Sequence, residues 1–239
     1  MSPKIVLASH HKTGSVFLRK VFEEFAKHVN MSFCFFDKSD KGPKKLDLLR
    51  YDIILLRHAN IEQIEQIIDL NAKVKVAHAI RNPRAMLISS TLYHKDSSEK
   101  WLHVPRPSLQ GKTFQEKINT LSIKDALLFQ LEHSKNIKDM LELKKYLSKN
   151  TSIKSECFRL EDLSHDKSLL TYQKLLSFLN FEGFDLLKGI EICSNNSLWY
   201  KKRTHSRTGA SEELIPEFDL DVEKKFQEIF SDVDKIIEM

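Results

Sequence analysis

The residues with the clearest chemical potential lie close together near the start of the chain. Segment 10–15, His-His-Lys-Thr-Gly-Ser, combines two imidazoles, an ammonium group and two hydroxyls around one glycine. Gly14 lets the backbone come close to a ligand without a side chain in the way. Lys12 supplies a mobile positive charge, and Thr13 and Ser15 add hydroxyl donors. This combination suits the binding of an anion such as a phosphate ester.

The pattern on either side of this segment predicts a strand, a tight loop and a helix. An apolar run at 5–8 precedes it, and apolar residues recur at helical spacing between 17 and 25. A helix that begins at the loop would direct its N–H groups and the positive end of its dipole toward an anion. Lys12 precedes Gly14, so this is no Walker A sequence. An ordinary βα turn with a solvated lysine remains the alternative.

Strand and helix patterns alternate along the chain. Further strands are predicted at 31–36, 52–57, 74–80 and 152–160, and helices begin after 60 and at 83. The run 52–57 has almost no polar alternation, which is typical of a parallel strand buried on both faces. We therefore predict an α/β fold with a doubly wound, mainly parallel five-stranded sheet flanked by helices. At this length we expect a single domain over residues 1–239.

The rest of the chain is expected to be mostly helical. We predict a loop at 94–112 that faces the substrate or is purely structural, a helical region at 117–149 broken once, and helices at 168–181, 186–195 and 221–237. In the last helix, Val222, Phe226, Ile229, Phe230, Val233 and Ile236 are expected to face inward.

The carboxyl ends of parallel strands lie at one edge of a sheet, and ligands bind at that edge in open α/β folds. Titratable or cationic residues fall at the predicted strand ends, namely His10, Lys12, Arg57, His58 and Arg81. The sequence therefore predicts that they converge on an anion site.

Composition narrows the class of protein. The net charge of +5 suits a small polyanionic ligand as well as it suits nucleic acid. The three cysteines form no C-x-x-C pair, so we expect neither a zinc site nor a disulfide framework, but a reducing compartment. There is no 18-residue apolar run and no leader pattern, which predicts a cytoplasmic protein without a membrane span. The basic run 201–207 has few aromatic neighbours, so we do not expect a nucleic-acid partner.

Three segments resemble motifs of the PAPS-dependent sulfotransferases, which transfer a sulfuryl group from 3′-phosphoadenosine-5′-phosphosulfate (PAPS). Segment 11–17, His-Lys-Thr-Gly-Ser-Val-Phe, is similar to their 5′-phosphosulfate loop, P-K-S-G-T-T-W. Segment 81–89, which begins Arg-Asn-Pro-Arg and ends in serine, resembles their 3′-phosphate motif. Segment 207–209, Arg-Thr-Gly, resembles their late R-K-G. Segments 56–58 and 158–163 are weaker matches to K-T-H and Y-E-D-L.

The resemblance implies a P-loop-NTPase-like sulfotransferase fold, PAPS as co-substrate, no metal, and a small-molecule or glycan acceptor. It assigns the 5′ end of PAPS to Lys12, Thr13, Gly14, Ser15, Val16 and Phe17, with Phe17 able to stack on adenine. It assigns the 3′-phosphate to Arg81, Ser89, Arg207, Thr208 and Gly209. Lys12 would stabilise the leaving phosphate, and His58 would take the proton of the acceptor hydroxyl or amine.

Several positions depart from the family pattern. His11 replaces proline, Leu160 replaces the tyrosine of Y-E-D-L, and Leu56 replaces the lysine of K-T-H, a contact that Arg57 could supply. Other residues remain candidates for the base: His10, His11, His94, Asp96 and Glu99. A catalytically silent PAPS-binding module remains an alternative function. A nucleotide-dependent phosphoryl transferase is less favoured, because no Mg²⁺-binding carboxylate ends a predicted strand at 55–56 or 79–80.

Overall fold

The computed structural model describes residues 4–37, 50–70, 73–197 and 218–238. These residues belong to two compact units. The sheet unit comprises the described residues up to Arg81 and those from Lys138 to 197. The helical unit comprises 82–137 and 218–238. Residues 82–137 of the helical unit are inserted between the two parts of the sheet unit, and residues 218–238 follow its second part along the chain. The prediction of a single domain stays a prediction.

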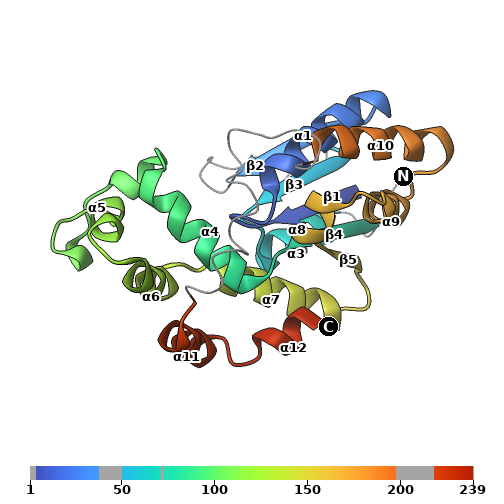
Figure 1. Ribbon diagram of the computed structural model, residues 1–239. Coiled ribbons are helices and arrows are strands. Elements are labelled where there is room, and N and C mark those ends of the chain that lie inside the picture. Colours follow the sequence, from blue (N-terminus) through green and yellow to red (C-terminus); the bar gives the residue numbers. More distant parts are fainter. Residues whose placement is uncertain (1–3, 38–49, 71–72, 198–217, 239) are drawn as a thin grey trace. The chain divides into compact units, whose positions relative to one another are not determined.

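The sheet unit is built on five parallel strands (Figure 1). They are β1 (Lys4–Ser9), β2 (Phe33–Asp37), β3 (Ile53–Arg57), β4 (Val74–Ile80) and β5 (Lys154–Arg159). Their order is β2-β3-β1-β4-β5, and each neighbouring pair is parallel. This confirms the predicted fold class and places β1 at the centre of the sheet.

Helices cover both faces of this sheet (Figure 1). On one face α1 (Ser15–His28), α9 (Leu170–Phe178) and α10 (Gly183–Asn196) pack on a core that contains Leu7. On the other, α3 (Ile61–Leu70) and α7 (Asn136–Lys149) pack on a core that contains Val6. Successive residues of β1 thus enter opposite cores. A short helix, α8 (Leu160–His165), follows β5 directly.

The helical unit contains α4 (Pro83–Asp96), the 3-10 helices η1 (Lys100–His103) and η2 (Pro107–Leu109), α5 (Phe114–Asn119), α6 (Ile123–His133), α11 (Leu220–Ile229) and α12 (Val233–Glu238). One of its apolar clusters includes Leu102, Phe114 and Phe129. The Arg84 guanidinium forms ion pairs with Glu223 at 2.7 Å and Asp234 at 2.9 Å, which tie α4 to α11 and α12.

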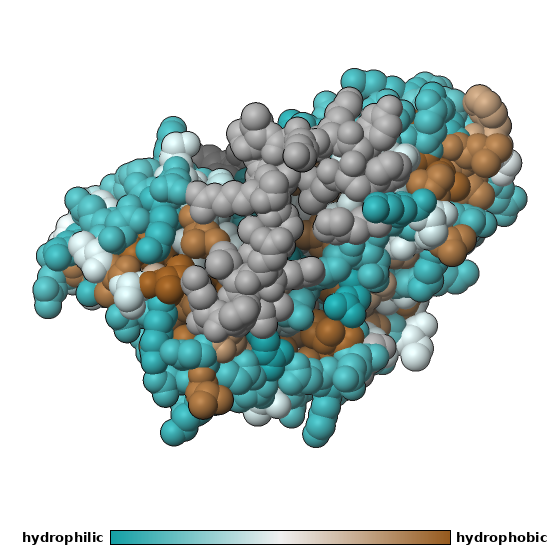
Figure 2. All heavy atoms as spheres, viewed as in Figure 1, coloured by the Kyte–Doolittle hydropathy of each residue, from teal (hydrophilic) through white to brown (hydrophobic). Residues whose placement is uncertain are grey.

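Most side chains on the visible face of both units are hydrophilic (Figure 2). Within the described residues, no helix has the length and apolar character that crossing a membrane requires.

Several predicted helix boundaries are wrong. The region 117–149 is interrupted twice, because Ser122 accepts from the Asp125 N–H to start α6, and α6 then ends at His133. The terminal helix is interrupted after Ile229, whose side chain is 41% exposed and does not face inward. The helix predicted to begin at 186 begins at Gly183. The predicted loop 94–112 contains the end of α4 and two 3-10 helices.

Candidate anion site at the end of the central strand

The turn that follows β1 is closed by hydrogen bonds between His10 and Thr13. The Thr13 hydroxyl accepts from the His10 N–H at 2.7 Å and donates to the His10 carbonyl at 3.0 Å. The Thr13 N–H donates to the same carbonyl at 3.2 Å. Lys12 lies within this turn with a positive φ of 68°. The Thr13 side chain therefore shapes the turn, and its predicted contact with an anion stays a prediction.

Gly14 joins the turn to α1. Its φ is 92°, and a Cβ atom here would lie 2.6 Å from Cδ1 of Leu160. The first N–H of α1 with a carbonyl partner is that of Leu18, which donates to the Gly14 carbonyl at 3.0 Å. Among the described residues, no carbonyl or side chain accepts from the N–H groups of segment 15–17. These donors, at the positive end of the helix dipole, suit an anion.

Arg81, at the end of β4, reaches the turn that holds Lys12. Its Nη1 donates to the Lys12 carbonyl oxygen at 3.1 Å, although 69 positions separate the two residues. The Nε atom of Arg81 lies 4.0 Å from Oε1 of Glu161, and the Nε atom of Arg159 lies 3.9 Å from Oε2. The residues that carry the first two sequence motifs thus meet within the sheet unit. Glu161 was not among the predicted site residues, although its position just after β5 places it at this edge of the sheet.

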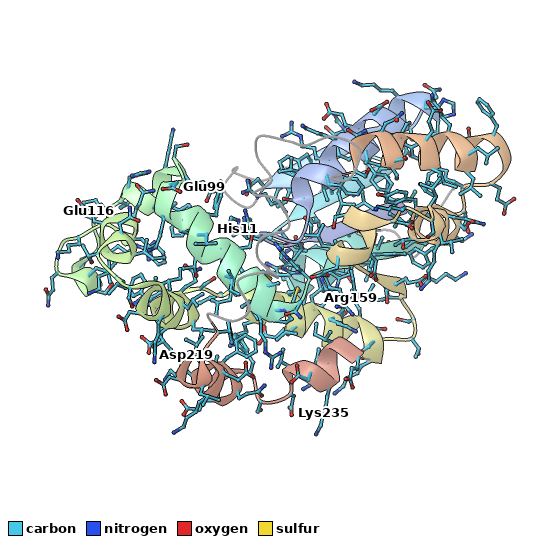
Figure 3. The ribbon with its side chains drawn as sticks, in the orientation of Figure 1. His11, Glu99, Glu116, Arg159, Asp219 and Lys235 are labelled. Carbon is cyan, nitrogen blue, oxygen red and sulfur yellow. The ribbon has the colours of Figure 1, made fainter. Side chains whose placement is uncertain are left out.

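His58 directly follows the neighbouring strand β3. Its backbone has a φ of 62°, a conformation that is uncommon for a residue other than glycine. Its ring is stacked with that of His11, with centroids 6.1 Å apart and planes 13° apart. His11 is labelled in Figure 3. Arg57, the preceding residue, forms an ion pair with Asp37 at 2.9 Å. That Arg57 supplies the contact made by the lysine of K-T-H stays a prediction.

A second pair of imidazoles is buried beneath the loop. Nε2 of His10 lies 2.9 Å from Nε2 of His78, on β4. Burial lowers the pKa of His78 to about 3, with a smaller effect of the Lys144 ammonium. Burial also lowers the pKa of His10 well below its ordinary value, and His78 and His58 add to this effect. Both rings are therefore neutral at pH 7.

The architecture has a close counterpart among solved structures. The structure of mouse sulfotransferase SULT7A1 complexed with PAP (3′,5′-diphosphoadenosine) is similar to this chain. The match covers 97% of this chain and 85% of the mouse chain, with a TM-score of 0.67 and 14% sequence identity. This chain has the sulfotransferase fold. No family model and no curated protein matches the sequence. At this identity the likeness shows the fold alone.

The other predicted residues are distributed over the chain. In the sulfotransferase fold of this chain, Ser89 is a half-buried residue of α4, in the helical unit. Three of the rival bases belong to that unit too: His94, Asp96 and Glu99. Nδ1 of His94 lies 2.9 Å from the Gln130 amide oxygen, and Glu99 accepts from the Trp101 indole at 2.7 Å. Segment 207–209 lies outside the described residues.

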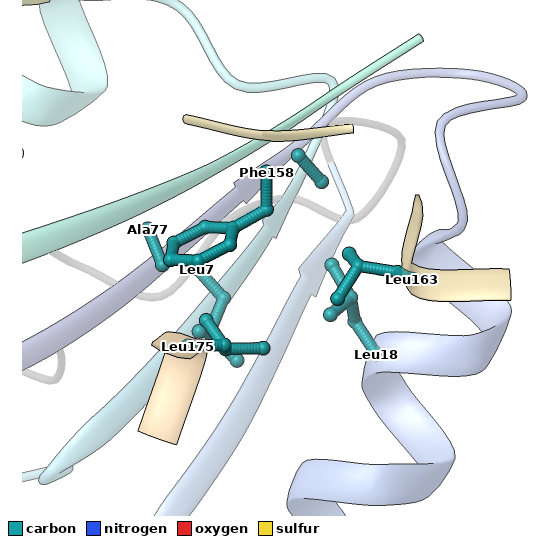
Figure 4. Close-up of a pocket in the computed structure, with 7 residues that line it drawn as sticks. Leu7, Leu18, Ala77, Phe158, Leu163 and Leu175 are labelled. Carbon is teal, nitrogen blue, oxygen red and sulfur yellow. The ribbon is translucent and has the colours of Figure 1, made fainter. Parts of the chain in front are cut away.

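One pocket in the sheet unit lies within the apolar core of this sulfotransferase fold (Figure 4). It is lined by Leu7, Leu18, Ala77, Ala79, Phe158, Leu163 and Leu175. These side chains are all apolar and could not pair with a phosphate or sulfate group. Among the described residues, no three His, Cys, Asp or Glu side chains gather to hold a metal ion.

Proposed function

We propose that this chain transfers the sulfuryl group of PAPS to a hydroxyl or amine of a small molecule or glycan. The observation that carries the proposal is the hydrogen bond between Arg81 and the Lys12 carbonyl. It brings the arginine of the 3′-phosphate motif against the loop of the 5′-phosphosulfate motif. The sulfotransferase fold supports the same reading, because the similar mouse enzyme was solved with PAP.

The 5′-phosphosulfate would bind at the start of α1. The N–H groups of Gly14 and segment 15–17 would donate to its oxygens, and the Ser15 hydroxyl would add a donor. The Lys12 ammonium would approach the oxygen that bridges phosphorus and sulfur. Phe17 would stack on adenine; its half-buried ring lies 6.3 Å from the Tyr172 ring, at a tilt of 31°.

The 3′-phosphate would bind Arg81. One of its five N–H donors serves the Lys12 carbonyl, and a guanidinium pairs well with phosphate oxygens. Ser89 and segment 207–209 are the proposed further partners of this phosphate.

Transfer would proceed by in-line attack. The acceptor oxygen or nitrogen forms a bond to sulfur as the bond between sulfur and the bridging oxygen breaks, and His58 takes the acceptor's proton. The phosphate of PAP leaves with the bridging oxygen and gains negative charge there. The Lys12 ammonium would stabilise that negative charge as it develops in the transition state.

The decisive test is calorimetric titration of the full chain with PAP, followed by an acceptor screen with ³⁵S-labelled PAPS. We expect PAP to bind in the micromolar range and AMP to bind at least tenfold more weakly, since AMP lacks the 3′-phosphate. Equal affinity for PAP and AMP, or no binding, would refute the proposal. Tight PAP binding without transfer to any acceptor would favour the catalytically silent binding module.

A further inference from the structure

Three side chains, two on neighbouring strands and one in the loop after β1, form a continuous series of close contacts. Cys157 on β5 and His78 on β4 are register partners, and Sγ of Cys157 lies 3.9 Å from Nδ1 of His78. The other ring nitrogen of His78 lies 2.9 Å from Nε2 of His10, at the start of the loop. Both imidazoles are buried, with exposed fractions of 0% and 1%. These contacts extend from an outer strand of the sheet to the anion site.

The chemistry of the three groups determines which of them donates and which accepts in each hydrogen bond. Two neutral imidazoles that meet nitrogen to nitrogen need one N–H and one lone pair, so their tautomers are coupled. Burial raises the pKa of the Cys157 thiol, which therefore keeps its proton at neutral pH. A thiol hydrogen can donate to an imidazole lone pair, whereas its sulfur is only a weak acceptor. The favoured order of donation is from Cys157 to Nδ1 of His78, and from Nε2–H of His78 to Nε2 of His10.

We infer that Cys157, His78 and His10 form a directional hydrogen-bond chain that fixes His10 as its Nδ1–H tautomer and positions the turn carrying Lys12. His10 connects these contacts to the turn, because its backbone N–H and backbone carbonyl both form hydrogen bonds with the Thr13 hydroxyl. The tautomer assignment stands on the contacts and on the donor chemistry of the thiol; the positioning of Lys12 for catalysis rests on the proposed function.

This assignment separates the roles of the histidines at the site. With a proton on Nδ1 and its Nε2 lone pair engaged by His78, His10 has no lone pair left to accept a substrate proton. His10 and His78 are then positioning residues, and His58 remains the candidate base. Among the described residues Nδ1 of His10 is a buried atom without a hydrogen-bond partner.

The test uses ¹⁵N-histidine-labelled full chain and two-bond ¹⁵N–¹H spectra, which distinguish protonated from unprotonated ring nitrogens. We expect protonated Nδ1 in His10 and protonated Nε2 in His78. Cys157→Ala should mix the tautomers of both rings, Cys157→Ser should restore them, and Cys34→Ala, at another half-buried strand cysteine, should change neither. A protonated Nε2 in wild-type His10, or unchanged tautomers in Cys157→Ala, would overturn the inference.

Activity supplies a separate readout. In Cys157→Ala we expect kcat to fall about three- to tenfold, the range that one neutral hydrogen bond supplies, with little change in PAP affinity. Cys157→Ser should recover most of this loss. Unchanged kcat in Cys157→Ala, despite mixed tautomers, would refute the positioning role. Failure of the wild type to bind PAP would refute the proposed function and leave the tautomer result standing.

Discussion

The guanidinium of Arg81 holds the carbonyl oxygen of Lys12 at 3.1 Å, so the end of β4 and the loop after β1 form one structure. Arg81 is mostly buried, with 15% of its side chain exposed, and Glu161 lies 4.0 Å from its Nε. The contact orients a full positive charge beside the N-terminus of α1. Two positive features of different origin, a guanidinium and a helix dipole, therefore lie at the same edge of the sheet.

Replacement of Arg81 should weaken binding of the 3′-phosphate. In Arg81→Ala we expect PAP affinity to fall about ten- to hundredfold, because charge-assisted hydrogen bonds are lost. Affinity for adenosine-5′-phosphosulfate, which lacks that phosphate, should change less than threefold. Calorimetry measures both. The control is Arg159→Ala, because Arg159 also lies near Glu161 but is 48% exposed. Equal weakening of the two ligands would mean that Arg81 only supports the loop.

Removal of the Lys12 ammonium should affect turnover more than binding. Because Lys12 has a φ of 68°, asparagine is the substitute that tolerates its backbone. We expect Lys12→Asn to lower kcat about 10²- to 10³-fold and PAP affinity less than tenfold. Steady-state kinetics and calorimetry measure these effects, with Lys20→Ala on the exposed side of α1 as control. Parallel losses in kcat and affinity would limit Lys12 to binding.

Substitution of His58 tests its role as base. His58→Asn keeps a residue type that accepts the positive φ and removes the imidazole. We expect kcat to fall about 10²- to 10⁴-fold while PAP affinity stays within threefold. His11→Asn removes the stacked neighbouring ring and should have the smaller effect. Full activity in His58→Asn would transfer the role to another residue.

A side chain at Gly14 should destabilise the sheet unit. Gly14→Ala combines the cost of a positive φ with overlap between its Cβ and Leu160. We expect a loss of about 2–5 kcal/mol in the free energy of unfolding by urea. Gly111→Ala isolates the backbone cost, about 1–2 kcal/mol, since Gly111 has a φ of 79° and open space around its Cβ position. Equal losses in the two variants would exclude a steric role for Leu160.

Acid should destabilise the fold through the buried imidazoles. The pKa of His78 is lowered from 6.5 to about 3 in the folded chain, so the unfolded chain binds more protons between these values. The stabilisation is complete above pH 6.5 and is lost as the pH falls toward 3. From pH 7 to 5, His78 accounts for a loss of about 2 kcal/mol. Urea unfolding across this range gives the free energy of unfolding as a function of pH. In His78→Gln this free energy should depend less steeply on pH than in the wild type, by the equivalent of about one proton. An unchanged slope would contradict a neutral buried His78.

The parts of the fold that follow from local pattern were predictable. Strand β4 has the predicted bounds because apolar residues dominate it from Val74 to Ile80 and Pro83 begins the next helix. The N-terminal cap of α3 also follows from local sequence, because asparagine is a common helix cap. The Asn60 side chain accepts from the Gln63 N–H at 2.9 Å. Signals of this kind lie within a few residues of the feature that they determine.

Features that depend on distant partners were not predictable. Nothing local marks Lys12 or His58 for a positive φ, since neither is glycine. The Thr13 hydroxyl could equally have faced a ligand, and only the folded turn shows its bonds to His10. The pair of Arg84 and Glu223 spans 139 positions, and no periodicity encodes such a separation.

The central place of β1 has a consequence for how the protein is made. The ribosome produces this strand and its loop before the neighbours of β1 in the sheet, β3 and β4, which begin at Ile53 and Val74. Leu160, which lies over Gly14, emerges only after the inserted residues 82–137 have been translated. The anion loop is therefore synthesised well before the last of the residues that complete its surroundings.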